Sequence, residues 1–145
     1  MIIKIIDWEI ESSAATNLRR EVFIVEQKVP ESDELDNQDQ HATHFIGIDP
    51  TTNTVTACAR LLNSGQIGRV AVKKEFRHRG YGQQLMDYII EYATQNNYPT
   101  LFLHAQVQTQ AFYRKLGFSP VGDTFMDAGI LHQSMQIAED TAGEN

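Results

Sequence analysis

The sequence predicts an α+β fold with one central, mixed but mostly antiparallel sheet flanked by helices. Its 145 residues, 41% of them hydrophobic, are enough to form one domain with a buried core. Short runs rich in β-branched residues alternate with segments that have the periodicity of amphipathic helices. Three of these runs follow one another with only turn residues between them, which is typical of an antiparallel meander.

The first half of the chain is predicted to hold a strand, a helix, an acidic loop and this meander. Ser12 or Ser13 can cap the helix, whose apolar positions recur every three or four residues. The loop contains Pro30 and, counted with Glu26, brings together six acidic residues. The predicted bounds are 2–6 for the strand, 12 or 13 to about 25 for the helix, 28–40 for the loop, and 43–48, 55–62 and 67–72 for the meander.

The second half is predicted to contain two helices and three strands. A long helix follows the glycine turn at 80–82 and stops before Pro99, while Gly117 stands where a left-handed cap would end a short helix. The other predicted bounds are 101–103 for a buried strand, 108–116 for the short helix, and about 120–122 and 130–137 for the last strands. Because strand–helix–strand crossovers are right-handed, strand 67–72 and the strand after the long helix should be parallel.

Charge and cysteine content narrow the class of protein. Nineteen acidic residues against twelve basic ones give a net charge of −7, which argues against binding to nucleic acid or to anionic membranes. Neither a signal peptide nor an apolar stretch of about 20 residues is found. The single cysteine, Cys58, excludes an internal disulfide and is expected in the core. We therefore expect a cytoplasmic protein, with one domain over 1–137 and a polar tail over 138–145.

A basic, glycine-containing segment reverses the acidic character of the chain. Arg77-His78-Arg79-Gly80-Tyr81-Gly82-Gln83 lies between a predicted strand and the start of the long helix. The free N–H groups of a helix start bind phosphate readily, and glycine lets a phosphate approach the backbone. A P-loop is excluded because no Gly-Lys-Ser/Thr follows, and Leu85 replaces the third glycine of a dinucleotide site. Taken alone, the segment fits either a phosphate site or a basic surface turn.

The wider context resembles the GCN5-related N-acetyltransferases (GNAT family). The Arg-x-x-Gly-x-Gly pattern of residues 77–82 resembles the coenzyme A loop of that family, and residues 110–118, QAFYRKLGF, resemble its segment after the fifth strand. The resemblance is firm over about 42–122. Residues 20–27, 103–106 and 127–132, together with Pro30, Glu34, Asp36 and His44, are similar to the ElaA-like branch, although Leu131 stands where that branch usually has proline.

This resemblance implies a GNAT fold in which the sheet splays between its fourth and fifth strands to admit acetyl-CoA, the cosubstrate. His41 and His44, beside Asp36 and Asp39, could bind a metal, but their spacing is loose and on a strand they would point to opposite faces, so no metal is expected. The fourth strand would pair with the pantetheine amides, and the loop and helix start would hold the pyrophosphate. The residues implied for coenzyme A are Val70, Ala71, Val72, Arg77, His78, Arg79, Gly80, Tyr81, Gly82 and Gln83.

The resemblance also implies a proton donor. Tyr113 matches the family's usual acid, which protonates the departing thiolate, although its spacing alone would favour a core aromatic residue. No base is evident from the sequence. The candidates named for it are Glu26, Asp36, His44 and His104, of which Glu26 and His44 are preferred.

The surroundings of the acceptor leave two alternatives open. The acidic segment is either a solvated loop or a lure for a cationic amine. Arg60 and His132 either line the acceptor side or pair with acids, and pairing is favoured for Arg60.

The expected function is transfer of an acetyl group from acetyl-CoA to a primary amine of an unidentified small-molecule or peptide acceptor, by direct attack on the thioester. The alternative is a non-catalytic module that binds coenzyme A as a sensor. A nucleic-acid-binding domain that uses residues 77–79 is opposed by the net charge. Because members of the family often dimerise, a homodimer is a candidate assembly.

Overall fold

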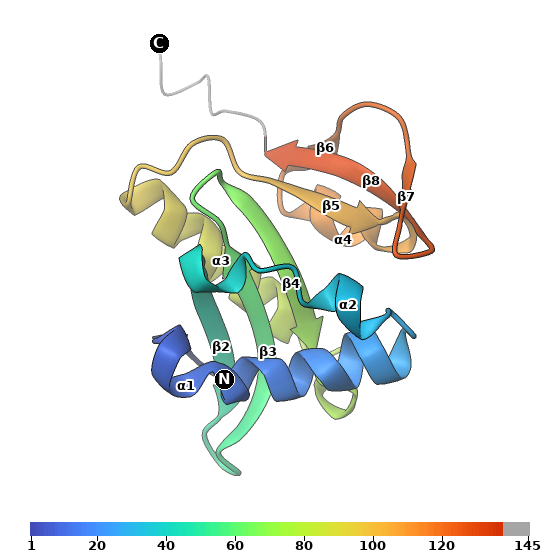
Figure 1. The fold of residues 1–145 in the computed structure, drawn as a ribbon. Helices are drawn as coiled ribbons and strands as arrows, with labels where there is room; N and C mark the ends of the chain where they lie inside the picture. Colours follow the sequence, from blue (N-terminus) through green and yellow to red (C-terminus); the bar gives the residue numbers. More distant parts are fainter. Residues whose placement is uncertain (138–145) are drawn as a thin grey trace.

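The computed structural model describes residues 1–137 and shows one eight-stranded sheet with helices on both faces (Figure 1). The strands lie in the order β1-β2-β3-β4-β5-β8-β6, and β7 pairs with β8. The strands are β1 (Ile2–Ile6), β2 (Thr43–Asp49), β3 (Thr54–Leu61), β4 (Gln66–Val72), β5 (Phe102–Gln106), β6 (Phe118–Pro120), β7 (Phe125–Asp127) and β8 (Ile130–Ile137). The helices are α1 (Trp8–Arg19), α2 (Glu31–Glu34), α3 (Tyr81–Gln95) and α4 (Gln110–Lys115), and a π-helical segment Arg20–Glu26 continues α1.

Every pair of neighbouring strands is antiparallel except β4 and β5. The α3 crossover joins these two strands and makes them parallel, as the sequence predicts. Their register consists of only two pairs, Gln66↔Phe102 and Ile67↔Leu103, after which the strands diverge (Figure 1). The sheet is therefore mixed and opens between its fourth and fifth strands, which confirms the predicted fold class.

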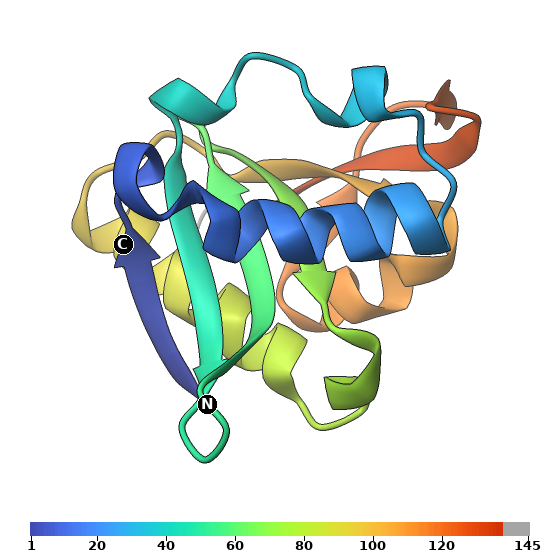
Figure 2. The same ribbon diagram turned by 60° about the horizontal axis from the view of Figure 1, so that its bottom comes forward.

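The two faces of the sheet carry separate cores. In Figure 2, α1 crosses one face, and α3 and α4 lie behind the sheet. The face with α3 and α4 buries the larger cluster, which includes Leu85, Met86 and Ile89 of α3. The face with α1 buries a smaller cluster that includes Leu18, Ile46 and Cys58, so Cys58 is a core residue as predicted. Among residues 1–137, no helix is long and apolar enough to cross a membrane.

Several predicted bounds are wrong. The first helix begins at Trp8, because the Asp7 carboxylate caps it by accepting the N–H of Glu9. It is kinked at Glu11, so its second part begins near the predicted start, but neither Ser12 nor Ser13 is the cap. The acidic segment is not a plain loop, since it contains α2 and a 3₁₀ turn at Asp39–His41. Strand β5 extends to Gln106, β6 precedes its predicted position, and β7 was not predicted. The predicted polar tail, 138–145, lies outside the described residues.

Candidate active site

A cavity of about 430 Å³ opens where β4 and β5 separate. Its walls are residues 66–70 of β4, residues 103–106 of β5, the end of the π-helical segment, α2 and the β7–β8 hairpin, with Tyr113 of α4. Beyond Ile67, no residue of β4 is paired with β5. An extended ligand with amide groups can therefore add itself to this edge of β4 as a further strand would.

A β-bulge turns the backbone of β4 beside this cavity. Cys58 pairs with Ala71 and Arg60 pairs with Gly68, so Ala59 lies opposite two residues, Arg69 and Val70. Arg69 has a φ of 52°, which lies in the left-handed region and is uncommon for a residue with a side chain. The bulge changes the direction of the β4 backbone at Val70, one of the residues implied for the coenzyme by resemblance.

Tyr113 lies on the wall of the cavity and is 9% exposed. Its ring packs edge-on against Phe112 and Phe118, with centroid distances of 5.0 and 6.1 Å. Burial raises the pKa of the phenol to about 12, so the hydroxyl stays protonated at neutral pH. The two sequence-based interpretations of Tyr113, a core aromatic residue and a proton donor, are therefore compatible, because Tyr113 packs its ring in the core and also lines the cavity.

The glycine turn lies at the start of α3, in the connection that leads from β4 to this helix. Gly80 precedes the helix with a φ of 79°, and His78 also has a positive φ, of 65°. No side chain caps the helix, so its first N–H groups are available to an anionic ligand. His78 and Arg79 are exposed beside them. This segment is outside the cavity lining, and a 3₁₀ turn at Lys74–Phe76 separates it from β4.

Arg77 and Glu26 form an ion pair with one another. The two guanidinium nitrogens of Arg77 contact the Glu26 carboxylate, one of them at 2.7 Å, and Arg77 Nε donates to the carbonyl oxygen of Val72 at 2.9 Å. The Arg77 hydrogen bond is the main reason that the pKa of Glu26 is lowered. Glu26 does not line the cavity, so the structure does not bring this candidate base to Tyr113.

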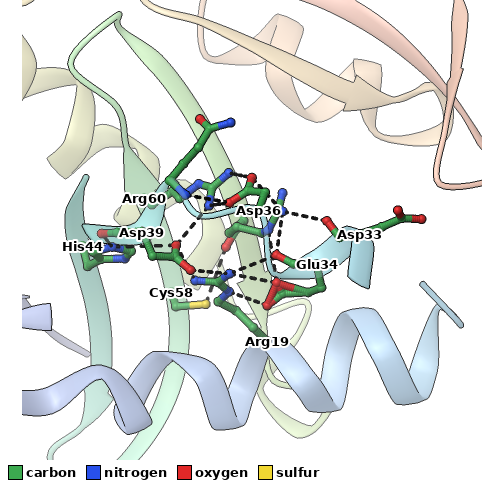
Figure 3. A network of polar contacts seen from close by, with 10 residues as sticks. Arg19, Asp33, Glu34, Asp36, Asp39, His44, Cys58 and Arg60 are labelled. Atoms are coloured by element: carbon green, nitrogen blue, oxygen red, sulfur yellow. Dashed lines mark hydrogen bonds and ion pairs between the residues drawn. The ribbon is translucent and has the colours of Figure 1, made fainter. Parts of the chain in front are cut away.

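The acidic segment is held down by three arginines (Figure 3). Arg19 of α1 binds both Glu34 and Asp39, and Arg60 of β3 binds both Asp36 and Asp39. Arg69 binds Glu34 and Asp36. We call residues 27–42 the strap, because this network fastens them across the sheet. Arg60 therefore pairs with acids, as favoured from the sequence.

This network corrects both interpretations of the acidic segment. Glu34 and Asp39 are buried and are not part of a solvated loop. Three arginines offset the charges of Glu34, Asp36 and Asp39, while Glu31 pairs with Arg20 and Glu26 with Arg77. Asp33 is the one member of the six acids with no cationic partner within residues 1–137, so the segment has little net charge with which to attract an amine.

One donor of the network has no protein partner. Arg60 Nε is buried and makes no hydrogen bond within residues 1–137. It faces Gly68, since a Cβ atom added at Gly68 would lie 3.9 Å from it, and both residues line the cavity. A buried donor without a partner is rare in native structures, so this atom is suited to a hydrogen bond with a bound molecule.

His44 lies apart from the cavity. Its side chain is 2% exposed, stacks on Trp8 at a centroid distance of 3.9 Å, and donates from Nε2 to the carbonyl oxygen of Asp39 at 2.8 Å. Burial is the main cause of its lowered pKa, so the ring is held neutral. The structure therefore uses His44 to fix the end of the strap and does not bring it to Tyr113.

Two other histidines do reach the cavity. His104 of β5 and His132 of β8 both line it, and Phe125 of β7 covers them, with centroid distances of 5.1 Å to His104 and 5.9 Å to His132. The sequence indicates both histidines as candidate residues. It does not predict that they lie together under Phe125, because β7 carries too few residues for a clear strand signal. The Gln27–Gln106 hydrogen bond across the cavity, 2.8 Å long, left no sequence signal either.

This combination of a mixed sheet, opened between two parallel strands, and a glycine turn at the start of the crossover helix defines the class of protein. Residues 10–139 match the family model described as "Acetyltransferase (GNAT) domain". The chain belongs to the GNAT family and is an acyltransferase.

Within this family the chain falls in the ElaA-like branch. It is 36% identical to protein ElaA of Escherichia coli over 132 residues, which cover 84% of each chain. The crystal structure of that protein superposes with a TM-score of 0.85 and 30% identity, covering 95% of this chain and 100% of the other. An acyl-CoA N-acyltransferase from Pseudomonas aeruginosa gives a TM-score of 0.84 and 30% identity, covering 94% and 99%.

Proposed function

We propose that this chain transfers the acetyl group of acetyl-CoA to a primary amine, which attacks the thioester directly. The observation that carries the proposal is the separation of β4 from β5 after two registered pairs, which leaves an unpaired strand edge beside a cavity lined by Tyr113.

In this proposal, each end of the coenzyme has a place. The pantetheine amides pair with the free edge of β4 at Val70, Ala71 and Val72. The pyrophosphate lies against the N–H groups of residues 78–83, where the dipole of the 15-residue helix α3 favours negative charge. Arg77 supports this site indirectly, because its contacts with Glu26 and Val72 tie the end of β4 to the π-helical segment.

The reaction places charge first on oxygen and then on sulfur. When the amine attacks, the carbonyl oxygen becomes an oxyanion, which a backbone N–H of β4 at the bulge stabilises. When the C–S bond breaks, both electrons stay on sulfur. The Tyr113 hydroxyl then donates a hydrogen bond to the thiolate, and its raised pKa ensures that the proton is present.

A panel of amines tests the proposal. The full chain is incubated with acetyl-CoA and n-propylamine, glycine, glucosamine, spermidine or a short peptide with a free N-terminus. Free thiol and acetylated amine are measured together. We expect both products in equal amounts with at least one amine.

The matched variants are Tyr113→Phe and Tyr92→Phe, of which Tyr92 lies against Phe45 away from the cavity. Loss of the Tyr113 hydroxyl should lower kcat by about 10²-fold or more, with little change in KM for acetyl-CoA, because the hydroxyl acts as the thiolate leaves. Tyr92→Phe should keep normal turnover. Binding of coenzyme A without transfer to any amine would contradict the proposal and favour a sensor.

A further inference from the structure

Two histidines share one face of the sheet at the cavity. In the antiparallel pairing of β5 with β8, Gln106 lies opposite His132 and His104 lies opposite Ser134. Residues opposite one another point to the same face, and so do residues two positions along a strand. His104 and His132 are therefore diagonal neighbours on this face, and both line the cavity that Tyr113 also lines.

The hydrogen bonding of His132 fixes which nitrogen carries its proton. Nδ1 of His132 lies 2.7 Å from the carbonyl oxygen of Ile130. A carbonyl oxygen can only accept, so Nδ1 is the protonated nitrogen. In the neutral ring, Nε2 then has a free lone pair, and no group in residues 1–137 forms a hydrogen bond or ion pair with it. The backbone has thus oriented a proton acceptor in the cavity wall.

The neighbours of His132 hold its ring without occupying Nε2. Phe125, the partner of His132 on β7, stacks on the ring with an angle of 23° between the planes. Gln106, its partner on β5, donates to Gln27 and accepts from Gln108, both at 2.8 Å, so its amide is engaged elsewhere. Phe125 therefore supports the ring on one side, and the Gln106 amide does not occupy Nε2.

The other two histidines considered as bases lack this arrangement. His44 uses its Nε2–H in the hydrogen bond with Asp39 and is outside the cavity. His104 lines the cavity, but none of the hydrogen bonds within residues 1–137 fixes its tautomer. Glu26 faces Arg77 instead of the cavity.

We propose that His132 is the general base of the transfer reaction, with Nε2 as the atom that takes the proton of the acceptor amine. This role rests on the proposed function. As the amine nitrogen bonds to the carbonyl carbon it becomes positively charged, and it gives one proton to Nε2. The C–S bond then breaks, the thiolate leaves with the electron pair, and the imidazolium passes its proton to the thiolate or to solvent. The products are the amide and coenzyme A.

The decisive variant is His132→Asn. The asparagine amide nitrogen stands close to the position of Nδ1, so it can keep the hydrogen bond with Ile130, but nothing replaces Nε2. The full-length variant is assayed with acetyl-CoA and the amine of the panel that the wild type acetylates fastest. We expect kcat to fall by about 10²–10⁴-fold, with KM for acetyl-CoA unchanged.

The matched control is His41→Asn, which makes the same exchange at an exposed histidine outside the cavity and should retain turnover within about fivefold of the wild type. Added imidazole should restore activity to His132→Ala by at least about tenfold and should leave wild-type turnover unchanged, which a purely structural role would not produce. Melting curves of each variant identify loss of fold, and His132→Gln serves if His132→Asn is unfolded.

The two failures are distinguishable. A wild type that acetylates an amine, together with a folded His132→Asn variant of normal kcat or a His132→Ala variant without imidazole rescue, would overturn the assignment of His132 alone. A wild type that binds coenzyme A in calorimetry but acetylates no amine would overturn the proposed function, and the role of His132 with it.

Discussion

Arg19 and Glu34 form a buried, two-pronged ion pair, in which Nε and one terminal nitrogen of Arg19 each lie 2.8 Å from a carboxylate oxygen of Glu34. Their side chains are 1% and 4% exposed. The pair joins α1 to the strap, and through Asp39 and Asp36 the same network reaches Arg60 and Arg69 at the cavity. The wall of the candidate active site is therefore built on charges that are satisfied only when α1, the strap and the sheet are all in place.

Removing one charge from this pair should be costly. Arg19→Gln leaves the carboxylates of Glu34 and Asp39 buried without their main partner, and loss of one member of a buried pair typically costs about 3–5 kcal/mol. Arg20→Gln is the control, because the Arg20–Glu31 pair is exposed and should be worth about 1 kcal/mol or less. Urea unfolding measures both, and equal losses in the two variants would show that the buried network does not fasten the strap.

Acid should release the strap. Burial alone would raise the pKa of Asp36, but the hydrogen bond and charge of Arg60 outweigh it and hold this pKa at about 2. The unfolded chain therefore binds more protons than the folded chain as the pH falls from about 4 toward about 2, and stability is lost over that range. Urea midpoints from pH 7 to pH 2.5 should fall steeply at the acid end for the wild type and less steeply for Asp36→Asn. Parallel curves would remove Asp36 as the source.

His44 should matter for stability and not for turnover. Burial lowers the pKa of its ring, so the folded state excludes a proton that the unfolded chain binds below about pH 6.5. His44→Phe keeps an aromatic ring against Trp8 but loses the hydrogen bond to Asp39. We expect a lower melting temperature, a smaller loss of stability between pH 7 and pH 5, and near-normal kcat. An undiminished melting temperature with lost kcat would return His44 to the list of bases.

A negative charge at the helix start should weaken binding of the coenzyme. A Cβ atom at Gly82 would lie 3.4 Å from the Phe112 ring, so a small side chain fits there, and a carboxylate would face the pyrophosphate. Gly82→Asp should cost at least about 2 kcal/mol of binding, or about 30-fold in Kd for coenzyme A. Gln95→Glu adds the same charge at the other end of α3 and should leave Kd unchanged in calorimetry. Equal Kd values for both variants would place the pyrophosphate elsewhere.

The sequence predicts the main helices and strands well because these elements follow local patterns of residues. The spacing of Leu85, Met86 and Ile89 identifies α3 and its buried face, and the handedness of the crossover then makes β4 and β5 parallel. Gly80 and Gly82 identify the helix start as a place where a phosphate can approach, since both positions lack a side chain.

The walls of the cavity were less predictable, because tertiary partners decide them. From the sequence, the acidic residues of the strap are interpreted as surface residues, because the arginines that pair with them, Arg19, Arg60 and Arg69, lie on other elements. Nothing in the sequence predicts the positive φ of Arg69, because a residue with a side chain normally avoids the left-handed region. The tautomer of His132 depends on one backbone carbonyl, that of Ile130, which only the geometry of the hairpin reveals.

The measurement that tests the central claim most directly is a crystal structure of the full chain with coenzyme A. We predict that the pantetheine lies between β4 and β5 along Val70–Val72, that the pyrophosphate contacts the backbone N–H groups of residues 78–83, and that the sulfur lies within hydrogen-bonding distance of the Tyr113 hydroxyl. A coenzyme bound outside the opening between β4 and β5, or a sulfur remote from Tyr113 with the cavity empty, would contradict the account.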